Sequence, residues 1–319
     1  MTKDNLPDAS LALELAGLKL SSPIVLLSGC VGFGEEYTRV AGFSNRDAGA
    51  ICLKGTTLNA RLGNPPHRLA ETPMGVLNAI GLQNPGAHAV VNDILPTLDF
   101  DETRFIANVS GSTVEEYAEV TRIFDDSAVD AVEINISCPN VKEGGVAFGN
   151  DPDMSARVVE ACRAVTKKPL ITKLSPNQTS IAYNAERCID AGTDALAVIN
   201  TMMGMAIDIH TRRPVIGNVQ GGLSGPAIKP IALLKVREVY GVARRHNIPI
   251  IGQGGIASAH DAIEFLIAGA SAVGVGTALF YDPLICAKIN DGIGDYLDLH
   301  GFANVGELTG TLADADCED

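Results

Sequence analysis

The chain has 319 residues, a length that fits either two domains or one large α/β barrel. Hydrophobic residues make up 46% of it and charged residues 19%, so the bulk of the chain is not disordered. The formal net charge is −14, which argues against binding nucleic acid through a broad basic face. Aromatic residues are scarce, and an apolar mass of Ala, Val, Ile and Leu suits packed β/α units better than a β-sandwich.

The cysteine pattern predicts free thiols. There are seven cysteines, an odd number, and none forms a Cys-x-x-Cys pair, so neither a disulfide framework nor a bound metal is expected. The first ten residues do not resemble a signal peptide, and no run approaches about 18 apolar residues, so we expect no membrane segment. Together these features favour a cytoplasmic protein, and residues 314–319 predict a flexible acidic tail.

Eight short apolar runs alternate with helical patterns along the chain. The expected strands are 23–27, 50–53, 104–107, 131–136, 169–172, 195–199, 248–252 and 272–275. The expected helices are 113–125, 153–167, 179–191, 229–245 and 259–268. Continuous apolar runs are typical of parallel strands that are covered on both faces. The alternation therefore predicts an α/β fold, a (β/α)8 TIM barrel that forms one domain over 1–319, with a doubly wound sheet as the alternative.

Two connections are too long to be simple loops. They run from Thr56 to His88 and from Met202 to Ile228, and each follows the carboxyl end of an expected strand. Loops of this length in a compact domain usually carry function or form hairpins of their own. We therefore expect long insertions at the face where such barrels place their chemistry.

Polar residues stand at the ends of the apolar runs. Lys54 and Lys173 follow or end two of them, and a buried ammonium group is costly unless it is paired or holds an anion. Asn108, Asn135 and Asn200 end three others, although Asn is disfavoured in strands. The alternatives are an ordinary salt-bridged Lys and Asn residues that cap turns. Together, however, these side chains could read the amide and imide edges of a flat heterocycle.

Two glycine pairs and one cysteine complete the expected site. Gly254-Gly255 and Gly276-Thr277 follow the last two runs, where backbone N–H groups could approach a phosphate closely. Cys138 lies in a Gly-rich loop, where its thiol could act as a proton acceptor. An inert buried thiol is the alternative for Cys138.

The chain resembles the class 1B dihydroorotate dehydrogenases. The resemblance runs from about Ala12 to Phe280, and the segments that carry it are 78–86 (NAIGLQNPG), 135–149 (NISCPNVKEGGVAFG), 221–230 (GGLSGPAIKP) and 254–256 (GGI). The chain departs from the pattern at Gln253, where a small residue or Met is expected.

This resemblance implies a barrel with FMN across its mouth and assigns residues to it. The residues expected to contact FMN are Ser28, Lys54, Gly55, Asn108, Asn135, Lys173, Ile199, Gly225, Gly254, Gly255, Gly276 and Thr277. Those expected to line the dihydroorotate site are Lys54, Asn78, Ala79, Ile80, Gly81, Leu82, Asn135, Asn200 and Thr201. Cys138 would be the catalytic base that removes the C5 proton while C6 gives hydride to the flavin, and Lys54 would assist near the substrate carboxylate.

The resemblance also implies partners. Members of this class pass electrons to NAD through a second subunit that carries FAD and a 2Fe–2S cluster. This sequence has neither a cluster-ligand spacing nor a dinucleotide fingerprint, so both groups are expected on the partner only. We therefore expect a homodimer of this chain, extended to a heterotetramer by that subunit.

Three other functions share part of this pattern. A dihydropyrimidine dehydrogenase-like subunit would use the same cofactor and Cys chemistry on uracil or thymine. A fumarate-dependent class 1A-like enzyme is a second alternative, and Gln83 in segment 78–86 favours class 1B over it. A non-catalytic flavin-binding barrel is the third, but it has no need for a thiol, two lysines and three amides at its mouth.

Overall fold

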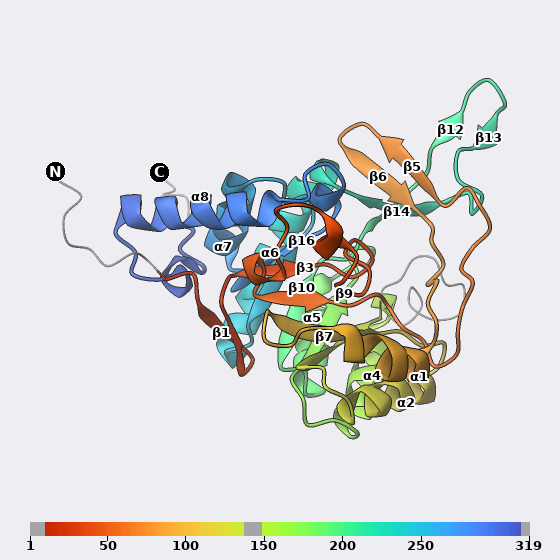
Figure 1. Ribbon diagram of the computed structural model, residues 1–319, viewed down its shortest axis with the longest axis horizontal. Coiled ribbons are helices and arrows are strands. Elements are labelled where there is room, and N and C mark those ends of the chain that lie inside the picture. The colour runs from red at the N-terminus through yellow and green to blue at the C-terminus, as the bar shows by residue number, and fades with distance from the viewer. Residues whose placement is uncertain (1–9, 137–148, 314–319) are drawn as a thin grey trace.

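Eight parallel strands form a closed barrel in the computed structural model, which describes residues 10–136 and 149–313 (Figure 1). The strands are β3 (Ile24–Leu26), β4 (Ala50–Cys52), β7 (Arg104–Val109), β8 (Ala131–Asn135), β9 (Leu170–Leu174), β10 (Ala195–Val198), β15 (Ile250–Gln253) and β16 (Ala272–Val275). Their order around the barrel is β10-β15-β16-β3-β4-β7-β8-β9, so each strand lies beside its neighbours in sequence order. The predicted TIM barrel is confirmed, and a doubly wound sheet is excluded.

Helices cover the outside of the barrel. They are α1 (Ala87–Ala89), α2 (Val114–Asp125), α4 (Pro152–Arg163), α5 (Ile181–Asp190), α6 (Lys229–Ala243), α7 (Ala259–Ala268) and α8 (Ile285–His300). Shorter 3₁₀ or π turns are η1 (Tyr37–Arg39), η2 (Asn45–Asp47), η3 (Val90–Ile94), η4 (Leu95–Thr97), η5 (Pro226–Ile228), η6 (Arg244–His246), η7 (Thr277–Phe280) and η8 (Val305–Leu308).

Side-chain caps start several of these helices where the sequence predicts a start. The Thr113 hydroxyl accepts a hydrogen bond from the Glu116 backbone N–H at 3.1 Å before α2. The Ser258 hydroxyl accepts one from the Asp261 N–H at 3.2 Å before α7. The Asp151 carboxylate accepts from two backbone N–H groups before α4. Each cap satisfies a donor that the first helical turn leaves unpaired.

A hairpin of β1 (Leu13–Leu15) and β2 (Leu18–Leu20) closes the amino end of the barrel. Leu15, Leu18 and Leu20 are buried and pack in one cluster with residues near the starts of the barrel strands, Ala50 and Ala272 among them. Burying these leucines seals that end against water. Chemistry is therefore confined to the opposite, carboxyl end of the strands.

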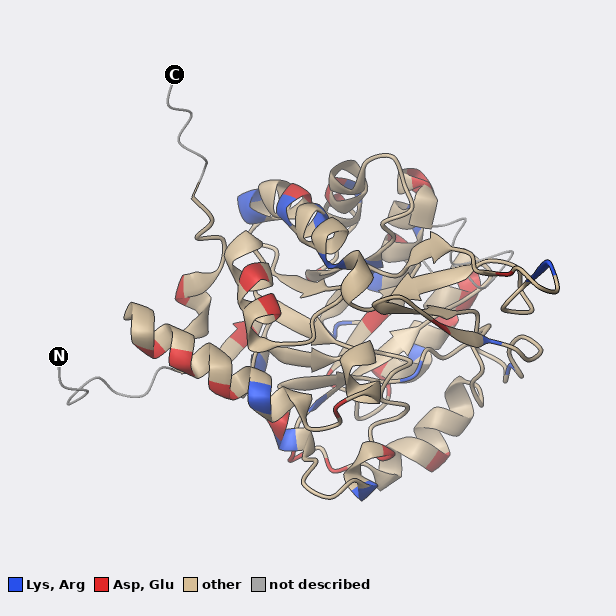
Figure 2. Ribbon diagram, turned by 90° about the horizontal axis from the view of Figure 1, so that it is seen from above, with Lys and Arg blue, Asp and Glu red and all other residues tan. Residues whose placement is uncertain are grey.

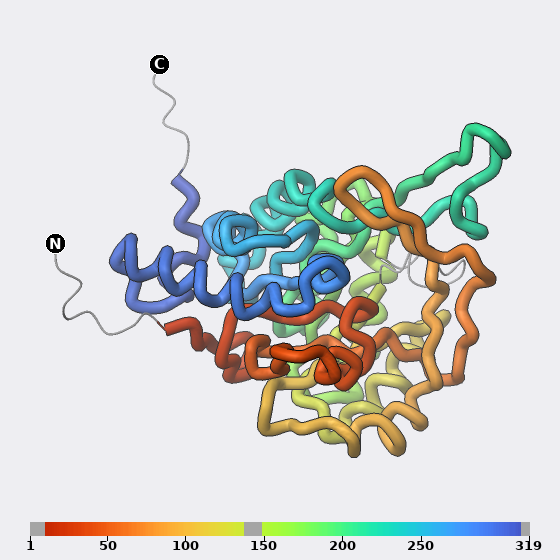
Figure 3. The backbone as a smooth tube through the Cα atoms, turned by 45° about the horizontal axis from the view of Figure 1, so that its top comes forward, coloured from red at the N-terminus to blue at the C-terminus, as the bar shows by residue number. Residues whose placement is uncertain are grey.

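The two long insertions build a second sheet over the carboxyl end. Strands β5 (Leu69–Thr72), β6 (Gly75–Asn78), β11 (Met202–Gly204) and β14 (Gly221–Ser224) pair antiparallel in the order β11-β14-β6-β5. A further hairpin, β12 (Ile207–Asp208) with β13 (Arg213–Pro214), projects beyond it. Figure 3 shows the two insertions side by side above the barrel.

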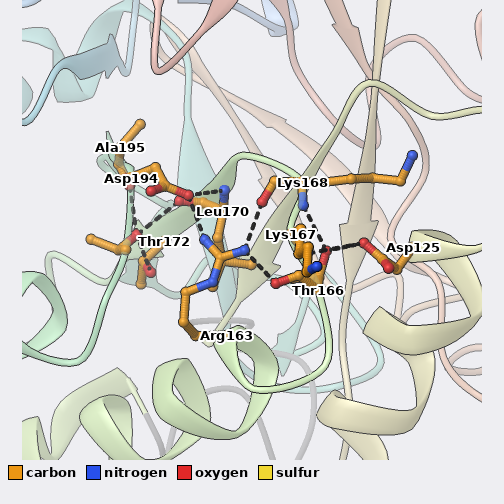
Figure 4. Close-up of polar contacts among 10 residues, drawn as sticks. Asp125, Arg163, Thr166, Lys167, Lys168, Leu170, Thr172, Asp194 and Ala195 are labelled. Atoms are coloured by element: carbon orange, nitrogen blue, oxygen red, sulfur yellow. Dashed lines mark hydrogen bonds and ion pairs between the residues drawn. The ribbon is translucent and has the colours of Figure 1, made fainter.

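A polar latch ties α4 to strands at the amino end of the barrel (Figure 4). The Arg163 guanidinium donates to an Asp194 carboxylate oxygen at 2.6 Å and to the carbonyl oxygens of Thr166 and Lys168 at 2.6 and 2.9 Å. The Asp194 carboxylate also accepts a hydrogen bond from the Leu170 N–H at 2.8 Å, at the start of β9. One arginine thus holds the end of its helix, the next loop and the strand start together.

Acidic and basic residues are interspersed over the outer helices (Figure 2). Helix α8 carries the exposed acids Asp291, Asp295 and Asp298 on its outer face. Within the described residues, no helix has the length and apolarity needed to cross a bilayer.

Candidate active site

A pocket of about 330 Å³ opens at the carboxyl ends of the strands, beneath the second sheet. Its volume lies within the range of roughly 300–1,000 Å³ that small-molecule sites occupy. The residues expected from the sequence that line it are Ser28, Lys54, Gly55, Asn78, Ile80, Leu82, Asn135, Lys173, Ile199, Asn200, Thr201, Gly225, Gly254, Gly255, Gly276 and Thr277.

Of the expected residues that the structure describes, three do not line this pocket. Asn108 lies fully buried behind Gly55, and a Cβ on Gly55 would come within 2.8 Å of the Asn108 Oδ1 atom. Ala79 and Gly81 alternate in sequence with Asn78, Ile80 and Leu82, which line the pocket, but do not line it themselves. Cys138 lies outside the described residues.

Two lysines, one carboxylate and one thiol meet at the pocket floor. Lys173 is 7% exposed, and its Nζ lies 4.0 Å from a carboxylate oxygen of Glu133. The Cys30 thiol lines the same pocket. Burial raises the pKa of Cys30 to about 11, an effect that the positive charges of Lys173 and Lys54 oppose. The thiol of Cys30 is therefore protonated at neutral pH, and the two lysines leave the floor with an excess of positive charge.

Three amides are arranged around this floor. The Asn200 side chain donates to the Asn135 Oδ1 at 3.0 Å, which joins the ends of β8 and β10 across the pocket. The Tyr117 hydroxyl donates to the Asn135 carbonyl at 2.9 Å. The Asn177 side chain, which follows β9, donates to the Thr201 carbonyl at 2.9 Å. These bonds hold the polar groups at fixed positions relative to one another, as recognition of a planar ligand requires.

Glu133 is the charged residue at this site that the sequence reasoning missed. It is 2% exposed and accepts hydrogen bonds from the Asn108 amide at 2.6 Å and from the Cys52 thiol at 3.3 Å. Glu133 lies in the middle of β8, whereas the polar residues that drew notice stand at the ends of the apolar runs. A glutamate inside the apolar run 131–136 was the available signal, because Glu is almost never fully buried unless it is paired.

A glycine cradle forms one side of the pocket. Gly254 and Gly255 have φ angles of +132° and +87°, which residues with side chains rarely adopt. A Cβ on Gly255 would lie 2.8 Å from the Gly225 carbonyl oxygen and 3.1 Å from the Lys229 backbone nitrogen, at the start of α6. Only glycine lets the backbone approach both the helix start and a ligand so closely.

A family model described as "Dihydroorotate dehydrogenase" matches residues 10–297. The chain belongs to the dihydroorotate dehydrogenase family. It is 52% identical over 94% of its length to "Dihydroorotate dehydrogenase B (NAD(+)), catalytic subunit" of Anoxybacillus flavithermus, covering 95% of that protein. Proteins of the same name from Caldicellulosiruptor bescii and Pelobacter propionicus are 48% and 50% identical over 95% of this chain, which cover 99% and 98% of those proteins. The resemblance expected from the sequence, class B included, is thus confirmed, and with it the assignment to oxidoreductases.

The motif 78–86 of this dihydroorotate dehydrogenase is held by one side chain. The Asn84 Oδ1 accepts from the Gly86 and Thr57 N–H groups at 2.8 and 3.2 Å, and its Nδ2 donates to the Leu82 carbonyl at 2.7 Å. Asn84 thereby fixes the curve that places Asn78, Ile80 and Leu82 against the pocket. Gln83 instead accepts from Arg68 at 2.6 Å, on the exposed side of the same curve.

Two buried amide oxygens at this site have no hydrogen-bond partner within the described structure. They are Oε1 of Gln253, which lines the pocket, and Oδ1 of Asn108 behind Gly55. The Gln253 amide is oriented by its bond to the Ile199 carbonyl at 2.9 Å. Unsatisfied buried acceptors are costly, and of the two only Gln253 belongs to the pocket lining, where a ligand could bring a hydrogen-bond donor. Sequence reasoning noted Gln253 only as a departure from the family pattern.

Proposed function

We propose that this chain oxidises (S)-dihydroorotate to orotate in pyrimidine biosynthesis, using FMN held across the mouth of the barrel. The single observation that carries the proposal is the convergence of Lys54, Lys173, Asn135 and Asn200 on a pocket whose side wall is a glycine cradle. Membership in the dihydroorotate dehydrogenase family supports the same reaction.

The residues present fit FMN. The Gly254-Gly255 cradle beside the start of α6, together with Gly276 and Thr277, offers backbone groups to a phosphate. The unpartnered Gln253 oxygen suits a ribityl hydroxyl or a ring N–H group. Lys173 supplies positive charge where a ring gains electrons. The other expected contacts are Ser28, Gly55, Asn108, Asn135, Ile199 and Gly225.

Bound FMN would supply the hydride acceptor for the C6 hydrogen of the substrate. On the substrate side, Asn78, Asn135 and Asn200 present amide groups that match the donors and acceptors of a dihydropyrimidine edge. Lys54 places an ammonium group suited to the substrate carboxylate. The curve 79–82 and Thr201 would close the remaining sides and exclude water.

Cys138 is the proposed base. Its thiolate would take the C5 proton as the C6 hydrogen leaves with its electron pair, so the ring loses two hydrogens and gains one double bond. Cys30, the thiol that lines the pocket in the described residues, is a poor base because burial raises its pKa to about 11. The proposal therefore assigns the proton to Cys138, as the family resemblance implies.

The test is Cys138→Ala, with the reduction of bound FMN by dihydroorotate followed in a single turnover. Loss of the base should slow flavin reduction by at least 100-fold, the order expected for general base catalysis. The matched control is Cys162→Ala, a buried thiol on α4, which should keep the wild-type rate. An unchanged rate of flavin reduction in Cys138→Ala would exclude Cys138 as the base. If dihydrouracil reduced the wild-type flavin faster than dihydroorotate does, the assignment of dihydroorotate as the substrate would be wrong.

We further propose that electrons leave through a partner subunit that carries FAD and a 2Fe–2S cluster and reduces NAD. The relatives' name, "catalytic subunit" of an NAD(+) enzyme, supports a second subunit. A cytoplasmic assembly of a homodimer of this chain with two partner subunits is expected. The test is affinity purification of this chain from its own host, followed by analysis of the co-purifying protein for iron and FAD. Reduction of NAD by dihydroorotate with this chain alone would contradict the proposal.

A further inference from the structure

The proposed function gives no role to Glu133, although it is the carboxylate closest to Lys173 in the described structure. Three groups meet its Oε1 atom: the Asn108 amide at 2.6 Å, the Cys52 thiol at 3.3 Å and the Lys173 ammonium at 4.0 Å. Each partner is a hydrogen-bond donor or a cation, and a carboxylate oxygen can accept from both. The residue itself does not line the pocket; it lies one layer below Lys173, which does.

This layering gives the pocket floor a definite charge arrangement. A buried ammonium group without a counter-charge tends to lose its proton or withdraw toward water. Glu133 offsets that cost for Lys173 and holds the Nζ atom near the end of β9. It also fixes the Asn108 amide by accepting from its Nδ2, which leaves Oδ1 directed toward Gly55. A single carboxylate therefore orients two of the side chains expected to contact the cofactor.

We propose that Glu133 is a positioning residue that sets the reduction potential of the bound flavin through its ion pair with Lys173. This inference rests on the proposed FMN site. Reduction adds electron density to the flavin, which the Lys173 charge favours and the Glu133 charge opposes. The pair thus presents a dipole to the pocket, with its positive end toward it, and bound FMN would sense that dipole.

The test is the midpoint potential of FMN bound to Glu133→Gln, measured at neutral pH with reference dyes. Removing the negative charge should favour reduced flavin, so at a fixed ambient potential the ratio of reduced to oxidised FMN should rise on the order of tenfold. Lys173→Met should shift the ratio in the opposite direction. The double variant, which carries neither charge, should lie between Lys173→Met and the wild type, because Lys173 lines the pocket and Glu133 lies behind it.

Two controls separate this role from simple support of the fold. Cys52→Ala removes an uncharged neighbour of Glu133 and should leave the potential unchanged, whatever it does to the melting temperature. The double variant guards against a Glu133→Gln chain that does not fold, because removing both members of a buried ion pair is often tolerated. A potential in Glu133→Gln equal to that of the wild type, or a double variant no closer to the wild type than Lys173→Met, would overturn the proposal. Wild-type protein that binds no FMN would instead refute the proposed function.

Discussion

Gln253 stands where the family resemblance leads us to expect a small residue or Met, and it lines the pocket. It is 1% exposed, donates from its Nε2 to the Ile199 carbonyl, and has an Oε1 atom without a partner, 3.0 Å from where a Cβ on Gly274 would lie. An amide kept in that state is costly to the ligand-free protein, so it fits a group whose partner arrives with the ligand. On this reading, the unpaired oxygen lowers the stability of the ligand-free protein and raises its affinity for the ligand.

We predict that Gln253→Met weakens FMN binding roughly three- to tenfold, the value of one hydrogen bond of about 0.5–1.5 kcal/mol. Titration of flavin-stripped protein with FMN, followed by flavin fluorescence, measures the dissociation constant. Gln220→Met, at an exposed position, serves as the matched control and should bind like wild type. Equal affinity in Gln253→Met and wild type would show that the amide acts only on the Ile199 carbonyl.

At the scale of single residues, site residues could be predicted where the type of side chain is unfavourable in its sequence surroundings. Lys54, Lys173 and Asn135 stood out because cations and amides are unfavourable at the ends of apolar strands, and all three line the pocket. Glu133 was missed because its partners, Cys52 and Lys173, come from other strands. Which groups pair across a barrel depends on strand register, and a single sequence carries no direct record of it.

Among the elements, the latch of Arg163 at the amino end shows how one side chain secures three segments. If it is removed, the carbonyls of Thr166 and Lys168 and the carboxylate of Asp194 lose their shared donor (Figure 4). The side chain of Arg163 is about a quarter exposed, so water can replace part of what is lost. The carbonyls that remain inside the loop still lose a charge-assisted bond.

We predict that Arg163→Met lowers the free energy of unfolding by about 1–3 kcal/mol, the usual cost of leaving buried acceptors unpaired. Urea unfolding followed by circular dichroism measures it. Arg122→Met, which loses an exposed ion pair with Glu119 on α2, is the control and should change stability by less than about 1 kcal/mol. If both variants lose the same stability, the latch contributes no more than a surface ion pair.

The elements themselves were predicted well where packing follows local pattern. No barrel strand begins or ends more than two residues from its expected position. Helix α8 was not predicted, because Gly292 and Gly294 interrupt it and lower its intrinsic propensity. It forms because Ile285, Ile289, Ile293 and Leu297, spaced four residues apart, are all buried against the barrel.

Over the whole molecule, closure of the barrel follows from the eight β/α alternations in the sequence. The second sheet over the mouth of the barrel does not follow from them. Strands β6 and β14 pair across about 145 residues of chain, and each is short and partly polar. The sequence of neither strand identifies the strand with which it pairs, because antiparallel pairing between distant segments depends on the barrel that brings them together. The insertions could be recognised as functional by length and position, while their sheet could not.

The buried thiols give the whole molecule a predictable response to alkaline pH. Burial raises the pKa of Cys162, Cys188 and Cys286 from 9.0 to about 12, and that of Cys30 to about 11. Below pH 9 these thiols hold their protons in both the folded and the unfolded chain. Between pH 9 and about 11 the unfolded chain releases them while the folded chain does not, so the free energy of unfolding must fall as pH rises.

Cys188→Ala isolates one of these contributions. At pH 8 we expect the variant to be less stable than wild type, because it leaves a cavity against α5. Above pH 9 the wild type should lose up to about 1.4 kcal/mol more per pH unit than the variant, so that the two stabilities converge. Urea unfolding at pH 8, 9.5 and 10.5 measures this. Val159→Ala, a buried change on α4 without a titrating group, is the control, and its difference in unfolding free energy from wild type should stay constant with pH. If the difference for Cys188→Ala also stays constant, the Cys188 thiol titrates alike in the folded and unfolded states.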